Sequence, residues 1–360
     1  MPNFLMKFLV FFLAVLFPSS SLASQGVIAD IDLADADNAV YNPVNKLMYI
    51  GYHDGIAVIE GTEMIYSIPL EGGQPVAVNT KNGYVYAIKY NAAAYPQAMG
   101  FLYLIQGTEV IKSVGYVGKF PSSFAVNSET GYFYVVRAPC PACLWVPPYT
   151  RYIQTVKDDE LSIKVPVGEW PRGMGVEPAT GYLYVANYLD RSVSVIQETS
   201  NIGTIMVASN PSKVVVNPNN GRVYVIISDK IAVIEGKELV ATLPALQYQE
   251  IVDIVVEPNS GYIYAAGQHD IVVFDGLDAI GYIEFSNWQH RLINNPNSGL
   301  IYALMGYNLA VIQGIDLITE IPIGGINQNY YSHLAVDSER GLVYVTSQSG
   351  NKVTIVGEIE

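Results

Sequence analysis

The sequence is poor in basic residues, and it contains few cysteines and histidines. Lysine and arginine number 19 against 33 aspartates and glutamates, so the formal net charge is −14. Because affinity for nucleic acid is built largely from Lys and Arg contacts to phosphate, this balance disfavours binding to nucleic acid or to an anionic membrane surface. We interpret the acidity as a property that keeps a protein soluble outside the cell.

The chain has no apolar run long enough to cross a membrane. At the N-terminus Lys7 precedes an apolar run from Phe8 to Phe17, and Ser21-Leu22-Ala23 supplies small residues for cleavage. This layout is typical of a secretory signal peptide, and the run is shorter than the roughly 20 apolar residues that a span needs. We predict a signal peptide over residues 1–24. The mature chain would begin near Ser24 or Gln25, have no membrane span, and be secreted, periplasmic or located at the cell surface.

Motifs of common catalytic sites are also missing: the chain has no nucleophile elbow, no Walker loop and no HExxH. Its two cysteines, Cys140 and Cys143, form one C-x-x-C, and Leu144 stands where a c-type haem site requires histidine. In a secreted chain the default for such a pair is a disulfide, which we predict here. A redox pair of the thioredoxin type lacks its strand–loop–helix setting, and a zinc site would need two more ligands.

Tyrosine is abundant, at 27 residues, and eight of these tyrosines mark an internal repeat. Each copy begins with Asn, Glu or Asp and ends in Tyr seven residues later, and copies recur every 37 to 50 residues. The copies are NPVNKLMY (42–49), NTKNGYVY (79–86), NSETGYFY (127–134), EPATGYLY (177–184), NPNNGRVY (217–224), EPNSGYIY (257–264), NPNSGLIY (295–302) and DSERGLVY (337–344). A period in this range indicates a solenoid or a propeller.

Each copy has the chemistry of a hairpin. An Asn-Pro or Glu-Pro pair opens a turn because proline presets φ, and the glycine four residues after the first position can take positive φ. The first copy has Lys46 in the glycine position, and we expect Asn45 beside it to adopt the left-handed conformation. After the turn, segments such as GRVYVII (221–227) alternate with period two, as a strand does.

Two more strands follow in most units, for example IAVIEG (231–236) and ELVATLPA (238–245). Four short strands in about 40 residues are typical of a β-propeller blade, and no 3.6-residue pattern supports a strand-plus-helix horseshoe. The eighth unit stops after its third strand (352–356), whereas GVIADIDLADA (26–36) is a strand without a blade of its own. We therefore predict an all-β fold over residues 25–360. It is an eight-bladed β-propeller of four-stranded blades, closed by the N-terminal strand, which completes the last blade.

Unit four, PRGMGVEPATGYLYVANYLDRSVSVI (171–196), resembles the YVTN-type β-propeller repeat. The likeness lies in its Val-Glu-Pro turn, its Gly-x-x-Tyr-Val-Ala-Asn strand and its Val-Ser-Val-Ile strand. It covers nearly the whole chain after the leader and is strongest in units four to eight. The resemblance implies similarity to periplasmic and surface-layer propeller proteins, and it carries over no catalytic residue.

The connections from fourth to first strands break the regularity of the repeat. Propeller geometry places them on one face with the second-to-third turns, opposite the repeat turns, which we interpret as structural together with the eight tyrosines. With the insertions of unit two (89–101) and unit three (137–151), they form a predicted ligand-binding face. Its candidate residues are Tyr95, Trp145, Tyr149, Trp170, Arg172, Trp288, His290, Arg291, Tyr330, Tyr331 and His333. The alternative is that these aromatic residues cap the core at the blade ends.

All four histidines, His53, His269, His290 and His333, map to the same face. Imidazole is a good ligand for a metal or haem. However, no two histidines have close ligand spacing, and the pairs His53-Asp54 and His269-Asp270 are ordinary turn residues. We therefore expect neither a resident metal nor a cofactor.

The leading hypothesis is a secreted, non-enzymatic propeller that binds a small molecule or a protein through the insert-bearing face. One alternative is an extracytoplasmic enzyme, either a lyase or a metal- or haem-dependent oxidoreductase, with its site at the axial mouth. A second alternative is a structural component of a surface layer.

Deletion of Val27–Leu33 would remove the strand that we expect to close the ring. The last blade would then expose an unpaired edge, so we expect a sharply lower melting temperature in differential scanning calorimetry. An unchanged melting temperature would contradict the closure.

Overall fold

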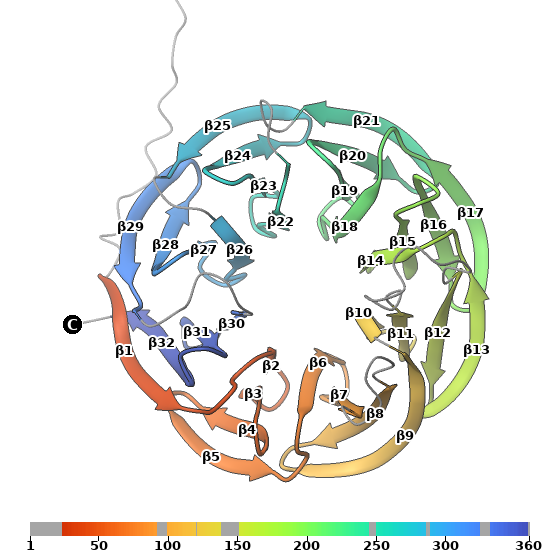
Figure 1. Ribbon diagram of the computed structural model, residues 1–360. Helices are drawn as coiled ribbons and strands as arrows, with labels where there is room; N and C mark the ends of the chain where they lie inside the picture. Colours follow the sequence, from red (N-terminus) through yellow and green to blue (C-terminus); the bar gives the residue numbers. More distant parts are fainter. Residues whose placement is uncertain are drawn as a thin grey trace, which may run out of the picture.

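The computed structural model describes residues 24–91, 99–119, 121–137, 151–244, 250–285, 289–324 and 332–358. These residues form strands and turns, with no helix among them. The strands make eight antiparallel sheets of four strands each, arranged as a ring (Figure 1). The prediction of an all-β, eight-bladed β-propeller is thus confirmed.

Within blades 1 to 7 the strands follow chain order from the axis outward (Figure 1). Blade 1 contains β2 (Ala39–Asn42), β3 (Leu47–Tyr52), β4 (Gly55–Glu60) and β5 (Glu63–Ile68), and blade 2 contains β6 (Gly73–Val78), β7 (Val85–Asn91), β8 (Met99–Gln106) and β9 (Glu109–Lys119). Blade 3 contains β10 (Pro121–Asn127), β11 (Tyr132–Arg137), β12 (Tyr152–Lys157) and β13 (Glu160–Pro166). Blade 4 contains β14 (Pro171–Val176), β15 (Tyr182–Asn187), β16 (Ser192–Gln197) and β17 (Ser200–Met206). Blade 5 contains β18 (Pro211–Val216), β19 (Val223–Ile227), β20 (Lys230–Glu235) and β21 (Glu238–Pro244). Blade 6 contains β22 (Asp253–Val256), β23 (Ile263–Ala266), β24 (Asp270–Asp275) and β25 (Asp278–Glu284). Blade 7 contains β26 (Gln289–Asn294), β27 (Ile301–Met305), β28 (Asn308–Gln313) and β29 (Asp316–Pro322). Blade 8 combines β30 (Leu334–Asp337), β31 (Leu342–Ser347) and β32 (Lys352–Glu358) with β1 (Gln25–Asp32).

Blade 8 takes its outermost strand from the start of the chain. β1 pairs antiparallel with β32, with Asp32 opposite Lys352, and lies at the rim of the ring (Figure 1). Asp30 accepts hydrogen bonds from Thr354 Oγ1 at 2.6 Å and from Lys352 Nζ at 3.0 Å. Although burial raises the pKa of Asp30, these two bonds hold it below its ordinary value. The predicted closure of the ring by the N-terminal strand is confirmed.

The hydrophobic core lies between blades. Eight buried clusters fill the gaps between neighbouring blades, one cluster for each pair. The repeat tyrosines belong to these clusters, and each is 3% exposed or less: Tyr49, Tyr86, Tyr134, Tyr184, Tyr224, Tyr264, Tyr302 and Tyr344. Full burial of one large apolar side chain contributes roughly 1.5–3 kcal/mol. The interpretation of the tyrosines as blade-to-blade packing is confirmed.

The tyrosine hydroxyls also link blades by hydrogen bonds. Tyr264 donates to the carbonyl of Gly314 at 2.9 Å, in the turn between the third and fourth strands of the next blade. Equivalent bonds join Tyr49 to Gly107, Tyr184 to Gly236 and Tyr344 to Gly61. The bond from Tyr344 crosses from blade 8 to blade 1, so it closes the ring on this side as well.

The residue that starts each repeat is buried and caps the turn. Asn217 Oδ1 accepts the N–H of Asn219 at 2.9 Å, and its Nδ2 donates to the carbonyl of Gly261 in the next blade at 3.1 Å. Glu257 uses its carboxylate in the same way and accepts the N–H of Asn259 at 2.8 Å. The position needs a side-chain oxygen that accepts backbone N–H groups, which explains why only Asn, Glu and Asp occupy it.

Lys46 itself adopts the left-handed conformation, with φ of 61°. The expectation that Asn45 would take this conformation was wrong. The reason is the backbone bond from the N–H of Lys46 to the carbonyl of Asn42 at 2.8 Å, which the glycine makes in six other copies, as Gly261 does with Glu257 at 2.8 Å. This bond fixes the left-handed position at the fifth residue of the repeat, whatever residue stands there.

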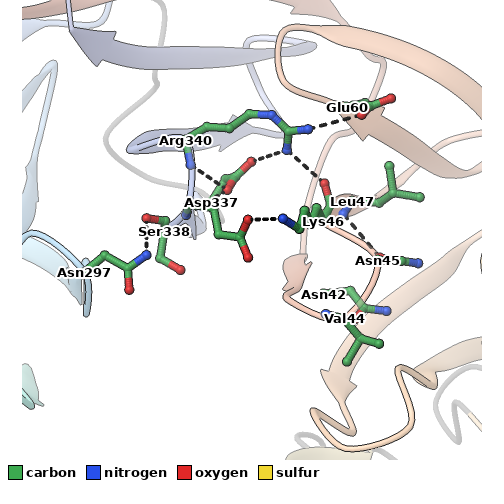
Figure 2. Close-up of polar contacts among 11 residues, drawn as sticks. Asn42, Val44, Asn45, Lys46, Leu47, Glu60, Asn297, Asp337, Ser338 and Arg340 are labelled. Atoms are coloured by element: carbon green, nitrogen blue, oxygen red, sulfur yellow. Dashed lines mark hydrogen bonds and ion pairs between the residues drawn. The ribbon is translucent and has the colours of Figure 1, made fainter.

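The side chain of Lys46 helps to join the first and last blades (Figure 2). Its Nζ lies 2.6 Å from Glu339 Oε2 of blade 8. Arg340 of blade 8 donates to the Lys46 carbonyl at 3.0 Å and pairs with Glu60 at 3.1 Å and with Asp337 at 2.8 Å. A glycine at position 46 could not reach Glu339, so the departure from the repeat adds an ion pair at the point of closure.

Backbone hydrogen bonds distinguish the two faces of the ring. On one face the fourth-to-first connections bond to the second-to-third turns, as when the N–H of Tyr188 donates to the carbonyl of Trp170 at 3.0 Å. The insertions of units two and three leave from the same end of their blades, so we call this the insert face. The repeat turns and the third-to-fourth turns form the opposite, repeat-turn face.

Arg340→Ala tests the seam between blades 8 and 1. The side chain of Asp337 is 1% exposed, and loss of its cationic partner should lower the free energy of unfolding by about 1–2 kcal/mol. Arg222→Ala is the matched control, because Arg222 pairs with the half-exposed Glu235 inside blade 5 at 2.5 Å, and such surface pairs contribute about 0–1 kcal/mol. Urea denaturation measures both values, and equal losses would show that the seam has no special role.

Candidate functional site

The insert face contains a cleft of about 770 Å³ between blades 1, 2 and 8. Its lining residues are Asp35, Tyr52, His53, Glu71, Gly72, Gln74, Lys89, Tyr90, Phe101, Tyr103 and Gln348. Aromatic rings together with a few polar and charged groups are the usual composition of a small-molecule pocket. The sequence predicts His53, Lys89, Tyr90 and Phe101 on this face, but it singles out none of the lining residues as an individual ligand-binding candidate.

Blade 2 supplies most of the aromatic wall because its central hairpin is long. β7 continues to Asn91 and β8 begins at Met99, with Lys89 opposite Phe101. The assignment of the whole stretch 89–101 to an insertion was therefore wrong at both ends. The alternation of the flanking residues continues the strand pairing, and only residues 92–98 lie outside the described part.

Two contacts fix the aromatic wall. The ring of Phe101 lies 5.9 Å from the ring of Tyr116 on β9. Tyr90 donates to the carbonyl of Pro121 in blade 3 at 2.8 Å. Burial raises the pKa of Tyr90 to about 12, and the charge of Asp37 acts in the same direction. Tyr90 therefore stays neutral at physiological pH and keeps its donor role.

The polar wall comes from blade 1 and from the connection between β1 and β2. His53 Nδ1 lies 3.2 Å from Asp35 Oδ2. The Tyr52 hydroxyl lies 2.5 Å from Ser67 Oγ. This hydrogen bond fixes the Tyr52 ring to β5, the outermost strand of blade 1. The histidine and the aspartate are more than half exposed, which leaves their polar atoms accessible from the cleft.

Gln74 lies at the bottom of the polar wall, where blades 1 and 2 meet. Its Oε1 accepts the N–H of Asn38 at 3.2 Å. Gly51 makes room for it, since a Cβ at that position would lie 2.3 Å from Gln74 Oε1. A side chain at position 51 would therefore displace the amide and change the shape of the cleft.

The structure describes only part of the predicted site. Trp170, Arg172, Arg291 and His333 are described with their side chains, on the insert face of blades 4, 7 and 8. Outside the described residues lie Tyr95, Trp145, Tyr149, Trp288, Tyr330 and Tyr331, together with the side chain of His290. Cys140 and Cys143 also lie outside, so the disulfide stays a prediction.

Trp170 and Arg172 form a cluster with Tyr188, a residue that sequence reasoning missed. The guanidinium carbon of Arg172 lies 5.0 Å from the centre of the Trp170 ring and 3.8 Å from that of Tyr188. We call these three residues the Trp170 cluster. A sequence signal was available, because Tyr188 follows the repeat tyrosine by four positions, as His53, Tyr90 and Gln348 follow theirs. This position points to the insert face in each of these blades.

Arg291 and His333 share the same position within their repeats. Each stands four residues before the start of its repeat, as Lys213 and Asp253 do. Lys213 pairs with Asp253 of the next blade, and His333 Nε2 lies 3.2 Å from Asp37 Oδ1 of the chain entering blade 1. The contacts of Lys213 and His333 thus run from one blade to the next. The predicted ligand-binding site stays a prediction.

The inner strands of blades 1, 2, 7 and 8 also enclose an axial hollow of about 500 Å³, lined mainly by apolar residues such as Val40, Ile293 and Val336. Two of the four histidines have aspartate partners, since His53 pairs with Asp35 and His333 with Asp37. Among the described residues no group of three or more His, Cys, Asp or Glu side chains could hold a metal. The expectation of no resident metal remains a prediction, because both cysteines and the His290 side chain lie outside that part.

No protein-family model matches the chain, and no curated protein sequence matches it either. Within the described residues there is also no helix of the length and apolar character needed to cross a membrane. Function therefore has to be inferred from the fold and from the geometry of the insert face.

Asp270, at the second-to-third turn of blade 6, gives a pH-dependent test of this face. Its Oδ1 is buried and has no hydrogen-bond partner among the described residues. Burial raises its pKa above the ordinary 3.8, against the lowering effect of His269 and with added repulsion from Glu284. Between pH 3.8 and the raised pKa of Asp270, the folded protein therefore binds more protons than the unfolded chain. The free energy of unfolding falls as the pH rises through this range.

We expect Asp270→Asn to raise the melting temperature at pH 7, because the amide carries no charge to desolvate. The difference from the wild type should vanish near pH 3, below the ordinary pKa of 3.8, where aspartate is protonated in both states. A difference of the same size at both pH values would contradict the role of ionisation.

Proposed function

We propose that this protein is a secreted, non-enzymatic β-propeller that binds a small molecule in the cleft between blades 1, 2 and 8. The observation that carries the proposal is the cleft itself, whose volume of about 770 Å³ falls within the roughly 300–1,000 Å³ of typical ligand sites. It opens on the insert face, where connections and turns vary from blade to blade. The repeat-turn face, in contrast, is occupied by repeated structural hydrogen bonds.

The two walls of the cleft favour a polar ligand with one apolar face. Tyr90, Phe101 and Tyr103 offer ring surfaces on one side, while Asp35 and Glu71 offer acceptors on the other. Lys89 is the one lysine or arginine among the described lining residues. A neutral ring with several hydroxyl groups, such as a saccharide, suits this arrangement because its flat face can stack on the aromatic side and its hydroxyls can donate to the carboxylates.

Export and repeat type belong to the same proposal. The leader at residues 1–24 supports a periplasmic, secreted or cell-surface location. The repeat of residues 171–196 supports membership of the YVTN-type propellers. The non-enzymatic character is supported by the lack of a recognised catalytic motif in the sequence, and stoichiometric metal or a Soret band in the purified protein would favour the enzyme alternative instead.

Phe101→Ala tests the cleft. Saturation-transfer NMR with a panel of neutral di- and trisaccharides should first identify a binder to the wild type. Its affinity should then fall at least about tenfold in the variant, because a central aromatic contact is lost. Tyr307→Ala is the matched control, since Tyr307 is a 51% exposed tyrosine on the insert face of blade 7 and should leave the affinity unchanged. Equal affinities of Phe101→Ala and wild type, or no binder in the panel, would refute the proposed ligand class.

A further inference from the structure

The Trp170 cluster lies on blade 4, apart from the cleft of blades 1, 2 and 8. Arg172 is exposed on the insert face, and its guanidinium carbon lies over two rings that are tilted by 56° to each other, with centres 5.4 Å apart. Both ring centres, at 3.8 Å and 5.0 Å, are within the roughly 6 Å over which a cation is attracted to an aromatic face. Contact with an aromatic ring of this kind uses none of the five guanidinium N–H groups in a conventional hydrogen bond.

The carboxylates near the Trp170 cluster are engaged elsewhere. Glu169 pairs with Arg151 at 2.8 Å. Asp190 Oδ2 accepts the backbone N–H of Glu169 at 2.7 Å. Arg172 itself has no ion pair and no hydrogen-bond acceptor within the described part of the chain. The positive charge of Arg172 therefore lies beside the two rings without a carboxylate partner in the described part of the chain. The protein as a whole has a net charge of −14.

The backbone around Arg172 is held in place on both sides. Trp170 has φ of 56°, a conformation that is uncommon for a bulky residue and persists only where the surroundings enforce it. Its carbonyl accepts the N–H of Tyr188 at 3.0 Å. On the other side, a Cβ at Gly173 would lie 2.3 Å from the carbonyl of Ser212, so β14 lies directly against β18. The arginine is thus preorganised before any ligand arrives, which lowers the entropic cost of binding.

We propose that the Trp170 cluster is a second binding site, separate from the cleft, for the carboxylate group of a small organic anion with an apolar body. The guanidinium edge matches a carboxylate in a bidentate pair, and the ring of Tyr188 beside it provides surface for the apolar body. The nearest cation on the adjacent innermost strand, Lys213, is paired with Asp253. One uncompensated positive charge on an acidic protein favours a monoanion over a multiply charged anion.

Phenylacetate is a suitable probe, with 2-phenylethanol as its uncharged analogue and inorganic phosphate as an oxyanion without an apolar body. We expect phenylacetate to bind the full-length protein in isothermal titration calorimetry and to change tryptophan fluorescence. The other two probes should bind at least about tenfold more weakly, because each lacks one half of the recognised structure. Added sodium chloride should weaken the binding of phenylacetate.

The variants assign the binding to Arg172. Arg172→Gln should lower phenylacetate affinity at least about tenfold, and Arg172→Lys should lower it less, because lysine keeps the charge but loses the bidentate fork. Arg191→Gln is the matched control, an exposed arginine in the turn of the same blade, and should bind as the wild type does. Circular dichroism melts establish that the variants are folded. If Arg172→Gln does not fold, the affinity of Arg172→Lys provides the comparison with the wild type.

Three results would overturn the proposal: no phenylacetate binding to the wild type, equal binding of 2-phenylethanol, or full affinity in the folded Arg172 variants. Phe101→Ala should keep the phenylacetate affinity of the wild type. Failure of the saccharide test and failure of the carboxylate test are therefore distinguishable.

Discussion

The buried clusters of this protein lie between blades rather than within them, so each blade needs both neighbours to cover its faces. This requirement makes closure of the ring the constraint on which the rest depends. The pairing of β1 with β32 completes the last blade. The contacts of Lys46 and Arg340, with the bond from Tyr344 to Gly61, then join that blade to the first one. With the ring closed, the loops of distant blades keep fixed positions, and a cleft shared by blades 1, 2 and 8 can exist.

The two faces of the ring are under different constraints. On the repeat-turn face, the buried Asn, Glu or Asp and the tyrosine hydroxyl repeat the same contacts around the ring, as Asn217 and Tyr264 illustrate. Substitution there disturbs an interface between blades. The insert face is held by backbone bonds between connections and turns, which demand little of the side chains. It can therefore carry Trp170, Arg172 and the cleft residues without loss of the shared core.

Most of the fold could be predicted because its determinants are local and repeated. The tyrosine period gave the number of blades, and the unmatched strand near the N-terminus gave the closure. The cleft could not be predicted in the same way, because Tyr52, Tyr103 and Gln348 come from three blades and meet only in the assembled ring. Tyr188 was missed and Lys46 was misjudged for another reason, because each depends on its position within the repeat. Tyr188 stands four residues after the repeat tyrosine, and Lys46 is the fifth residue of its repeat. Residue type alone indicated neither role.

The composite blade also determines the order in which the molecule can be completed. Asp30 and Lys352 are 322 positions apart, so β1 finds its partner only after the seven other blades have been synthesised. Contacts between such distant segments slow folding. Until they form, β1 and the unfinished sheet both present unpaired edges that other chains can join. The protein is therefore exposed to aggregation during the interval in which the other blades are made and blade 8 is still incomplete.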